Sequence, residues 1–286
     1  MDVLPVRHHL LTLWDHAKHH VLTFWEEVEI SLLLGILGIL AYVWLYWRSG
    51  GRDAYNESAE DKKARWSSLF QNMDDGDVAK ELVQPSDKPE IMRLSQKCGL
   101  TLRTLLNDTA LDLSHKALDD SDGFGLAALL RSHPTLEQLD LSHNELGSTA
   151  IEAMVKAGSK AAQLTSLNVM HNSLSDESAG VALGEFACQC PTLRELHAGQ
   201  NYLRDGGGRA IAAALREPEC GLQRLTMPQC HLGDETAYAL GAALQVCTLL
   251  KRLSLWGNEH MTAAAQKQLR KAWGEDRGHL MLDDDE

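Results

Sequence analysis

Histidines are the residues of this 286-residue chain whose type and spacing come closest to a chemical site. His115, His143 and His171 follow one another at intervals of 28 residues, and His16 and His20 lie four residues apart, as on one face of a helix. Neutral imidazoles in such arrays can bind a metal ion or an acidic group, and they titrate near neutral pH. The Ser-His-Asn sequence around His143 is also ordinary for the solvated end of a strand. For His16 and His20, the simpler explanation is that histidines tolerate lipid headgroups. We therefore favour no metal site in either set.

No catalytic motif accompanies these histidines. The segment Gly123-Phe-Gly125-x-x-Ala128 imitates a dinucleotide-binding fingerprint, but it begins about ten residues after its expected strand instead of directly after it. It therefore predicts a glycine-rich helix start, and Gly206-Gly207-Gly208 predicts close helix packing. The sequence has no nucleophile elbow, phosphate loop or His-Glu-x-x-His motif. We predict a chain that is not an enzyme and has no catalytic, cofactor-binding or metal-binding residues.

An eleven-residue pattern recurs in the second half of the chain and must position His115, His143 and His171. Its clearest copy is Leu136-x-x-Leu139-x-Leu141-x-x-Asn144-x-Leu146. The central leucine recurs, with a period of 28 or 29 residues, as Leu111, Leu139, Leu167, Leu196, Leu225 and Leu253. Such regular self-similarity predicts a solenoid of stacked coils.

Each copy predicts a short strand followed by a turn. In Leu139-Asp140-Leu141 the two leucines point inward and Asp140 points outward, because side chains alternate along a strand. The turn position is held by Asn144, Asn172, Asn201, Cys230 and Asn258. A buried asparagine both donates and accepts hydrogen bonds, so these side chains predict a ladder along the turns. Lys116 takes this position in the first copy, which we predict to be a terminal cap.

A helix is expected after each strand. Asp205 and Asp234 begin two of these helices, where a carboxylate can accept from the free amides of its own helix and complement the helix dipole. Strands are spaced about 4.8 Å apart and helices about 10 Å apart, so stacking the coils bends the structure. The sequence thus predicts an α/β horseshoe with parallel strands on its concave face.

With this period, these turns and these helices, residues 104–282 resemble the ribonuclease-inhibitor-type leucine-rich repeats. The resemblance implies the horseshoe fold, with Leu280 and Leu282 in a last capping strand. It also implies binding of protein partners through the concave face or its rim. The family includes a GTPase activator, so a GTPase-activating regulator remains a less favoured alternative.

The outward strand positions are therefore the candidate protein-binding surface. Its early coils are acidic and its late coils basic. Tyr202 and Trp256 are the aromatic anchors that we expect to contribute most to binding. The alternative for Trp256 is that it packs under the C-terminal cap. The predicted binding residues are Asp112, Asp140, Asn168, Met170, Glu195, His197, Tyr202, Arg224, Arg252 and Trp256.

A single membrane span is predicted before the repeats. Residues 30–47 are eighteen residues without a charge, about 27 Å long as a helix, which is close to the hydrocarbon thickness. We place the span at 28–48, and Gly35 and Gly38 offer a surface for packing against other membrane helices. Basic residues are enriched after it, as Arg48, Arg52, Lys62, Lys63 and Arg65. The positive-inside rule then puts the repeats in the cytosol and the N-terminus outside or in a lumen.

The remaining segments are assigned by composition. Residues 1–27 predict an amphipathic helix lying on the bilayer, and residues 49–103 a linker that ends in one cap helix over 91–106. Residues 283–286 form an acidic tail. The net charge of −13 disfavours nucleic acid as a partner.

The sequence therefore predicts a single-pass, membrane-anchored scaffold or adaptor that binds proteins without catalysis and contacts the lipid bilayer. The alternative is an accessory structural subunit of a larger membrane complex, such as one in the mitochondrial inner membrane, whose other subunits would contact the span.

Overall fold

The computed structural model describes residues 83–158, 161 and 163–283. All of these belong to one compact unit, Lys63–Glu286. The predicted bilayer-lying segment, the membrane span with Gly35 and Gly38, and most of the linker lie outside the described residues. Within the part of the chain that is described, no helix has the length and apolar character needed to cross a membrane.

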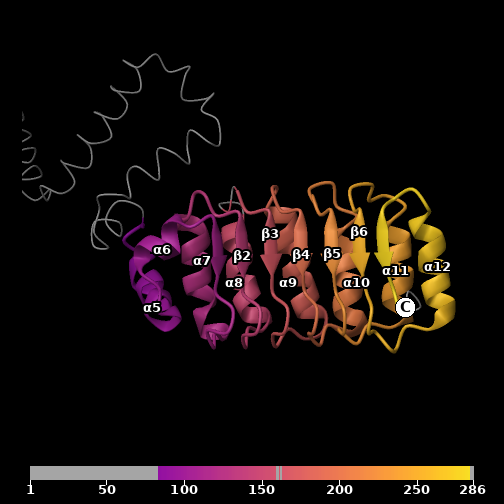
Figure 1. Ribbon diagram of the computed structural model, residues 1–286, viewed down its shortest axis with the longest axis horizontal. Coiled ribbons are helices and arrows are strands. Elements are labelled where there is room, and N and C mark those ends of the chain that lie inside the picture. Colours follow the sequence, from indigo (N-terminus) through magenta and orange to yellow (C-terminus); the bar gives the residue numbers. More distant parts are fainter. Residues whose placement is uncertain (1–82, 159–160, 162, 284–286) are drawn as a thin grey trace, which may run out of the picture. The chain divides into compact units, whose positions relative to one another are not determined.

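Seven parallel strands form one sheet in strict chain order (Figure 1). They are β1 (Ala110–Asp112), β2 (Gln138–Asp140), β3 (Ser166–Asn168), β4 (Glu195–His197), β5 (Arg224–Thr226), β6 (Arg252–Ser254) and β7 (His279–Met281). The register aligns Leu111 with Leu139 and so on through Leu253 and Leu280. The repeat period read from the sequence therefore sets the strand register, and the predicted capping strand around Leu280 is present.

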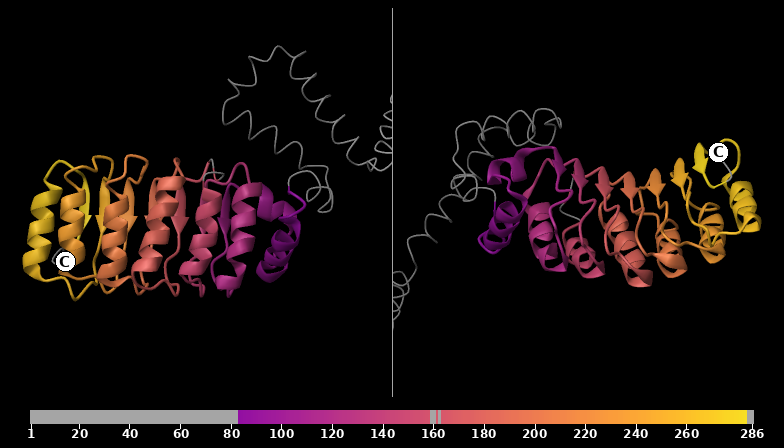
Figure 2. Two further views of the ribbon diagram at one scale, coloured as in Figure 1. Left: turned by 180° about the vertical axis from the view of Figure 1, so that it is seen from behind. Right: turned by 60° about the horizontal axis from the view of Figure 1, so that its bottom comes forward.

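One helix follows each of the first six strands and packs behind the sheet. These helices are α7 (Gly123–Ser132), α8 (Ser148–Gly158), α9 (Asp176–Gln189), α10 (Arg204–Ala214), α11 (Asp234–Ala243) and α12 (Ala263–Trp273), and a 3₁₀ turn, η2 (Asp120–Asp122), precedes α7. Figure 2 shows strands and helices as two layers, with the strands on the inner side of a shallow arc. The predicted α/β solenoid is confirmed for the repeats.

Leucines fill the space between the two layers. The central leucines from Leu111 to Leu253 are at most 4% exposed, whereas Leu280 in the last strand is only half-buried. Helices α9 and α10 approach so closely that a Cβ on Gly180 would lie 2.3 Å from the carbonyl oxygen of Gly207. The glycine-rich segment 206–208 is thus explained by helix packing, as its sequence indicated.

Asparagine side chains join neighbouring coils along the turns. The Asn144 amide donates to the carbonyl oxygens of Leu113 and Leu141, at 2.9 and 2.8 Å, and its oxygen accepts from the Leu118 N–H at 3.1 Å. Asn172, Asn201 and Asn258 make equivalent bonds. The Cys230 thiol instead donates to the Ala198 carbonyl at 3.2 Å, and burial raises the pKa of this thiol to about 12, so it stays protonated. The predicted ladder is present, with Cys230 supplying only the donor.

The aspartates at helix starts act differently from the prediction. Asp205 in the first turn of α10 accepts from the N–H groups of Gly233 and Thr236, both at 2.9 Å, which belong to the start of α11. Asp234 in α11 likewise accepts from Thr262 N–H, before α12, at 2.7 Å. Each carboxylate therefore caps the helix of the next coil rather than its own. The reason is that the free amides of the next helix lie beside it in the stack.

The N-terminal cap is also different from the single helix predicted over 91–106. It consists of α5 (Lys88–Cys98) and α6 (Leu102–Asn107). Gly99 separates them in a left-handed conformation (φ 68°), which glycine adopts without steric cost. Arg131 of α7 holds the start of α5 through a two-pronged ion pair with Asp87, at 2.8 and 3.0 Å.

Candidate protein-binding face

The outward side chains of the seven strands form two parallel rows on the concave face. The first row precedes the central leucine and contains Ala110, Gln138, Ser166, Glu195, Arg224, Arg252 and His279. The second row follows it and contains Asp112, Asp140, Asn168, His197, Thr226, Ser254 and Met281. Because the strands are in register, members of a row are direct neighbours across the sheet.

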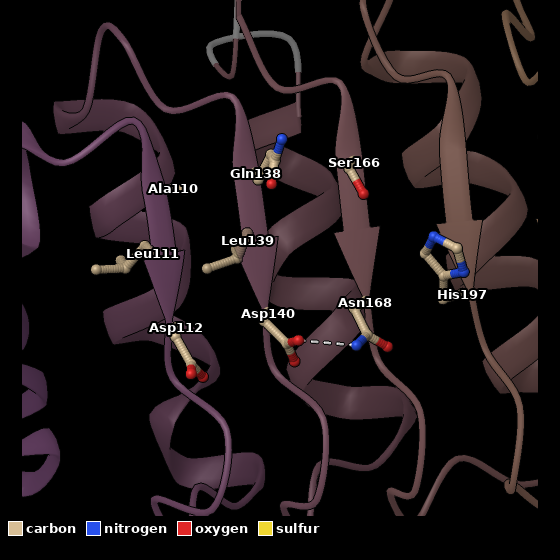
Figure 3. Close-up of a pocket in the computed structure, with 9 residues that line it drawn as sticks. All are labelled: Ala110, Leu111, Asp112, Gln138, Leu139, Asp140, Ser166, Asn168 and His197. Carbon is tan, nitrogen blue, oxygen red and sulfur yellow. Dashed lines mark hydrogen bonds between the residues drawn. The ribbon is translucent and has the colours of Figure 1, made fainter.

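A shallow hollow of about 370 Å³ lies over β1 to β4. It is lined by Ala110, Leu111, Asp112, Gln138, Leu139, Asp140, Ser166, Asn168 and His197 (Figure 3). Figure 3 shows Asp112, Asp140 and Asn168 side by side at the ends of their strands. Four of the predicted binding residues therefore line one depression.

Hydrogen bonds hold the polar side chains of this hollow in place. Asp140 accepts from the Ser142 N–H at 2.8 Å and from the Asn168 amide at 2.9 Å. Asp112 accepts from the Ser114 N–H at 2.9 Å. The Ser114 hydroxyl and N–H, more than any nearby charge, lower the pKa of Asp112, so this carboxyl is ionised at neutral pH. The hollow thus presents two ordered aspartates.

Glu195 links the acidic and basic parts of the face. Its carboxylate accepts from the Arg224 guanidinium at 3.1 Å and lies 3.6 Å from the His197 imidazole. The other nitrogen of His197 lies 2.9 Å from the Thr226 hydroxyl. Burial lowers the pKa of His197 and outweighs the attraction of Glu195. This cluster is therefore a set of hydrogen-bonding groups that hold one another in position on the face.

The C-terminal part of the face carries the exposed basic and apolar groups. Arg252 is exposed, and Trp256 and Met281 are 41% and 38% exposed. Trp256 therefore does not pack under the C-terminal cap, which was the alternative reading of this residue. Met170 lies beyond the second row, after β3, and is half-buried.

Tyr202 lies elsewhere than predicted. It follows β4 by five residues, on the loop edge where the strands end, and its ring is 57% exposed. There it stacks on His231 with ring centroids 5.1 Å apart. A second hollow, of about 330 Å³, is lined by His171, Asn172, Gln200, Asn201, Tyr202, Gln229 and His231. Tyr202 therefore belongs to the rim, and not to the concave face.

The histidine column noted in the sequence forms along the same loop edge. His115 stacks on His143 and His143 on His171, with ring centroids 4.3 and 4.5 Å apart. Gln200 continues the column and donates to Gln229 at 3.0 Å. Parallel stacked rings do not converge on one ion, and the described residues contain no group of three or more His, Cys, Asp or Glu able to hold a metal. Tyr202 and His231 occupy the same position of the repeat, directly after Asn201 and Cys230, but the pattern leaves the residue type at this position open, and their stacking was missed for that reason.

Comparison of this sequence with known protein families supports the repeat architecture. A family model described as "Leucine Rich repeat" matches residues 132–155 and 162–180. These segments are leucine-rich repeats. The matched part contains β2, α8 and β3, which are built like the coils on either side.

Two ribonuclease inhibitors are among the proteins to which this chain is similar. The Sus scrofa protein is 31% identical over 142 residues, which cover 49% of this chain and 31% of the inhibitor. The Mus musculus protein is 26% identical over 135 residues, with 47% and 29% covered. Bos taurus Tonsoku-like protein is 30% identical over 186 residues, 63% of this chain and 14% of that protein. The repeats and these relatives support a leucine-rich-repeat family, although the chain spans less than a third of each relative's length.

Proposed function

We propose that this chain is a non-catalytic scaffold that binds a protein partner on the concave face. The observation that carries the proposal is the division of roles along each strand. The central leucines are buried, whereas Asp112 and Arg252 on the strands are exposed, as is Trp256 just after β6. Exposed aromatic and arginine side chains on a preformed, curved surface are typical of binding energy hot spots.

Obstruction of the concave face tests this proposal. Ser166 lies half-buried on β3 within the hollow, so Ser166→Trp places a large side chain where the partner would lie. Glu185→Trp adds the same side chain on the exposed side of α9 and serves as the matched control. We expect the tagged full chain and the control to co-purify the same partner, and Ser166→Trp to lose it. Equal recovery by all three would refute the proposal.

Membrane anchorage by residues 30–47 is part of the proposal and rests on the sequence. An uncharged stretch of eighteen residues followed by basic residues is typical of a single-pass anchor with its C-terminal side in the cytosol. The full chain should resist alkaline carbonate extraction from membranes, and deletion of 30–47 should release it. Extraction of the intact chain by carbonate would argue against an anchor.

The alternative role is an accessory subunit of a larger membrane complex, supported by Gly35 and Gly38, whose spacing suits close packing of membrane helices. A stoichiometric partner lost on Gly35→Leu and Gly38→Leu, but retained by Ser166→Trp, would favour this role. Proximity labelling from the C-terminus would identify the neighbours and separate the cytosol from the mitochondrial matrix.

A further inference from the structure

We propose that the concave face takes a polypeptide segment with separated charges, its basic groups over β1 and β2 and its acidic groups over β5 and β6. This inference rests on the proposed function and names the chemistry of the partner. Two pairs of like charges, one at each end of the face, carry it.

The first pair is Asp112 and Asp140, which are directly opposite each other in the register of β1 and β2. His115 and Lys116 are close enough to attract the Asp112 carboxylate. Within the described residues, however, neither aspartate makes an ion pair. Adjacent strands are about 4.8 Å apart, so the negative charges of the two carboxylates repel each other. A guanidinium or ammonium group placed between the two carboxylates would relieve this repulsion.

The second pair is Arg224 and Arg252, which are opposite each other in the register of β5 and β6. Glu195 offsets the charge of Arg224, but Arg252 is exposed and makes no ion pair in the described part of the chain. His279 continues the row beyond Arg252. This end therefore suits carboxylates of a partner, and the exposed Trp256, which follows β6 in the same coil, offers an apolar contact.

The spacing of the two pairs defines the partner segment. The pairs are four strands apart and lie in different rows, which places their centres about 20 Å from each other, from a strand spacing of ~4.8 Å and a rise of ~3.3 Å per residue. About six residues of extended chain, or about thirteen of helix, cover that distance. The segment must cross the strands obliquely, because the aspartates belong to the second row and the arginines to the first.

Two peptides of one composition test this arrangement on the full chain in mild detergent. The block peptide has three arginines and three glutamates separated by a glycine-serine spacer of five residues, and the alternating peptide has the same residues with the charges interleaved. We expect the block peptide to bind at least about fivefold more tightly at low salt, because only it can meet both pairs at once. A nitroxide at its arginine end should broaden the amide signals of β1 and β2.

Matched variants separate this site from general attraction to an acidic protein. Asp112→Asn with Asp140→Asn should remove most of the preference for the block peptide, and Arg252→Gln should weaken it. Glu217→Gln with Glu219→Gln changes the net charge equally on an exposed loop away from the strands and should leave the preference unchanged. The inference would be overturned if the two peptides bound with equal affinity. It would also be overturned if both double variants lost the preference for the block peptide equally. If Ser166→Trp abolishes partner capture while the charge variants do not alter it, the concave site stands and only this charge assignment fails.

Discussion

The imidazole rings of His115 and His143 stack with centroids 4.3 Å apart and planes within 10°, although the residues are 28 positions apart in the chain. Both residues adopt left-handed backbone, with φ of 54° and 56°. The His115 N–H donates to the Ser142 carbonyl at 3.2 Å, which continues the hydrogen bonding of the sheet into the turn. The same left-handed backbone recurs at His171, Gln200, Gln229 and Gly257, so the repeat fixes this position and brings the side chains of adjacent coils next to each other.

The left-handed backbone at His143 should make that position sensitive to side-chain shape. We expect His143→Val to be about 2 kcal/mol less stable than His143→Gly, because a β-branched residue is strained at positive φ and glycine is not. Urea unfolding of the two variants measures the difference. If valine and glycine proved equally stable, the backbone of this turn would not be constrained as described.

Removal of a ladder asparagine should be costly. Asn172→Ala removes the side-chain acceptor of the Leu146 N–H and one of the two amide donors at the carbonyl oxygens of Leu141 and Val169, which keep the amides of Asn144 and Asn201. We expect a loss of about 1–3 kcal/mol, because the Leu146 N–H is left unsatisfied away from water. Asn168→Ala, on the outward row, should lose less than about 1 kcal/mol since water can replace its bonds. Similar losses in the two variants would contradict the structural role of the ladder.

The parts of the fold that depend on periodicity were predictable. The spacing from Leu111 to Leu253 defines the coils, their register and the outward rows, because one residue per coil must occupy each structural position. The binding residues on the strands followed from the same rule. Tyr202 did not, because it lies between Asn201 and Leu203, in the turn beyond the end of β4, where the inward and outward alternation of a strand no longer applies.

A contact between coils explains the difference at Asp205, and a local backbone conformation explains the difference in the cap. Asp205 was assigned to its own helix because sequence shows only neighbours along the chain, whereas its hydrogen-bond partners are about 30 positions later. The cap was predicted as one helix because apolar residues recur from Ile91 to Leu106 on both sides of Gly99. Gly99 breaks it by adopting a conformation that the apolar pattern does not reveal.

The carboxylate of Asp205 should stabilise α11 specifically. Asp205→Ala removes the acceptor for the Gly233 and Thr236 N–H groups and for the Thr236 hydroxyl. We expect a loss of about 1–2 kcal/mol, typical of a lost helix cap, and faster hydrogen exchange at the Thr236 amide. Asp276→Ala, at an exposed position after α12, is the control. Unchanged exchange at Thr236 would show that the carboxylate does not cap the next coil.

Buried His133 should make folding stability depend on pH. It is 2% exposed at the end of α7, and its Nδ1 accepts from the Thr135 N–H at 3.4 Å, which requires an unprotonated nitrogen. Burial lowers the pKa of His133 from 6.5 to about 4, with backbone groups of Asp108 and His133 opposing only part of the effect. The unfolded chain therefore binds more protons than the folded chain between about pH 4 and 6.5. The contribution of His133 is fully present above this window and is lost as the pH falls through it.

Replacement of His133 by a residue that does not titrate isolates this contribution. We expect the free energy of unfolding of the wild type to fall by about 2–3 kcal/mol more than that of His133→Gln between pH 7 and pH 4, since one pKa unit corresponds to about 1.4 kcal/mol. Subtraction of the two pH profiles removes the effect of the carboxyl groups, which titrate in both proteins. His279→Gln, at an exposed histidine on β7, should follow the wild-type profile. If His133→Gln also followed the wild-type profile, His133 would have to accept a proton in the folded protein. The burial of His133 described above would then be wrong.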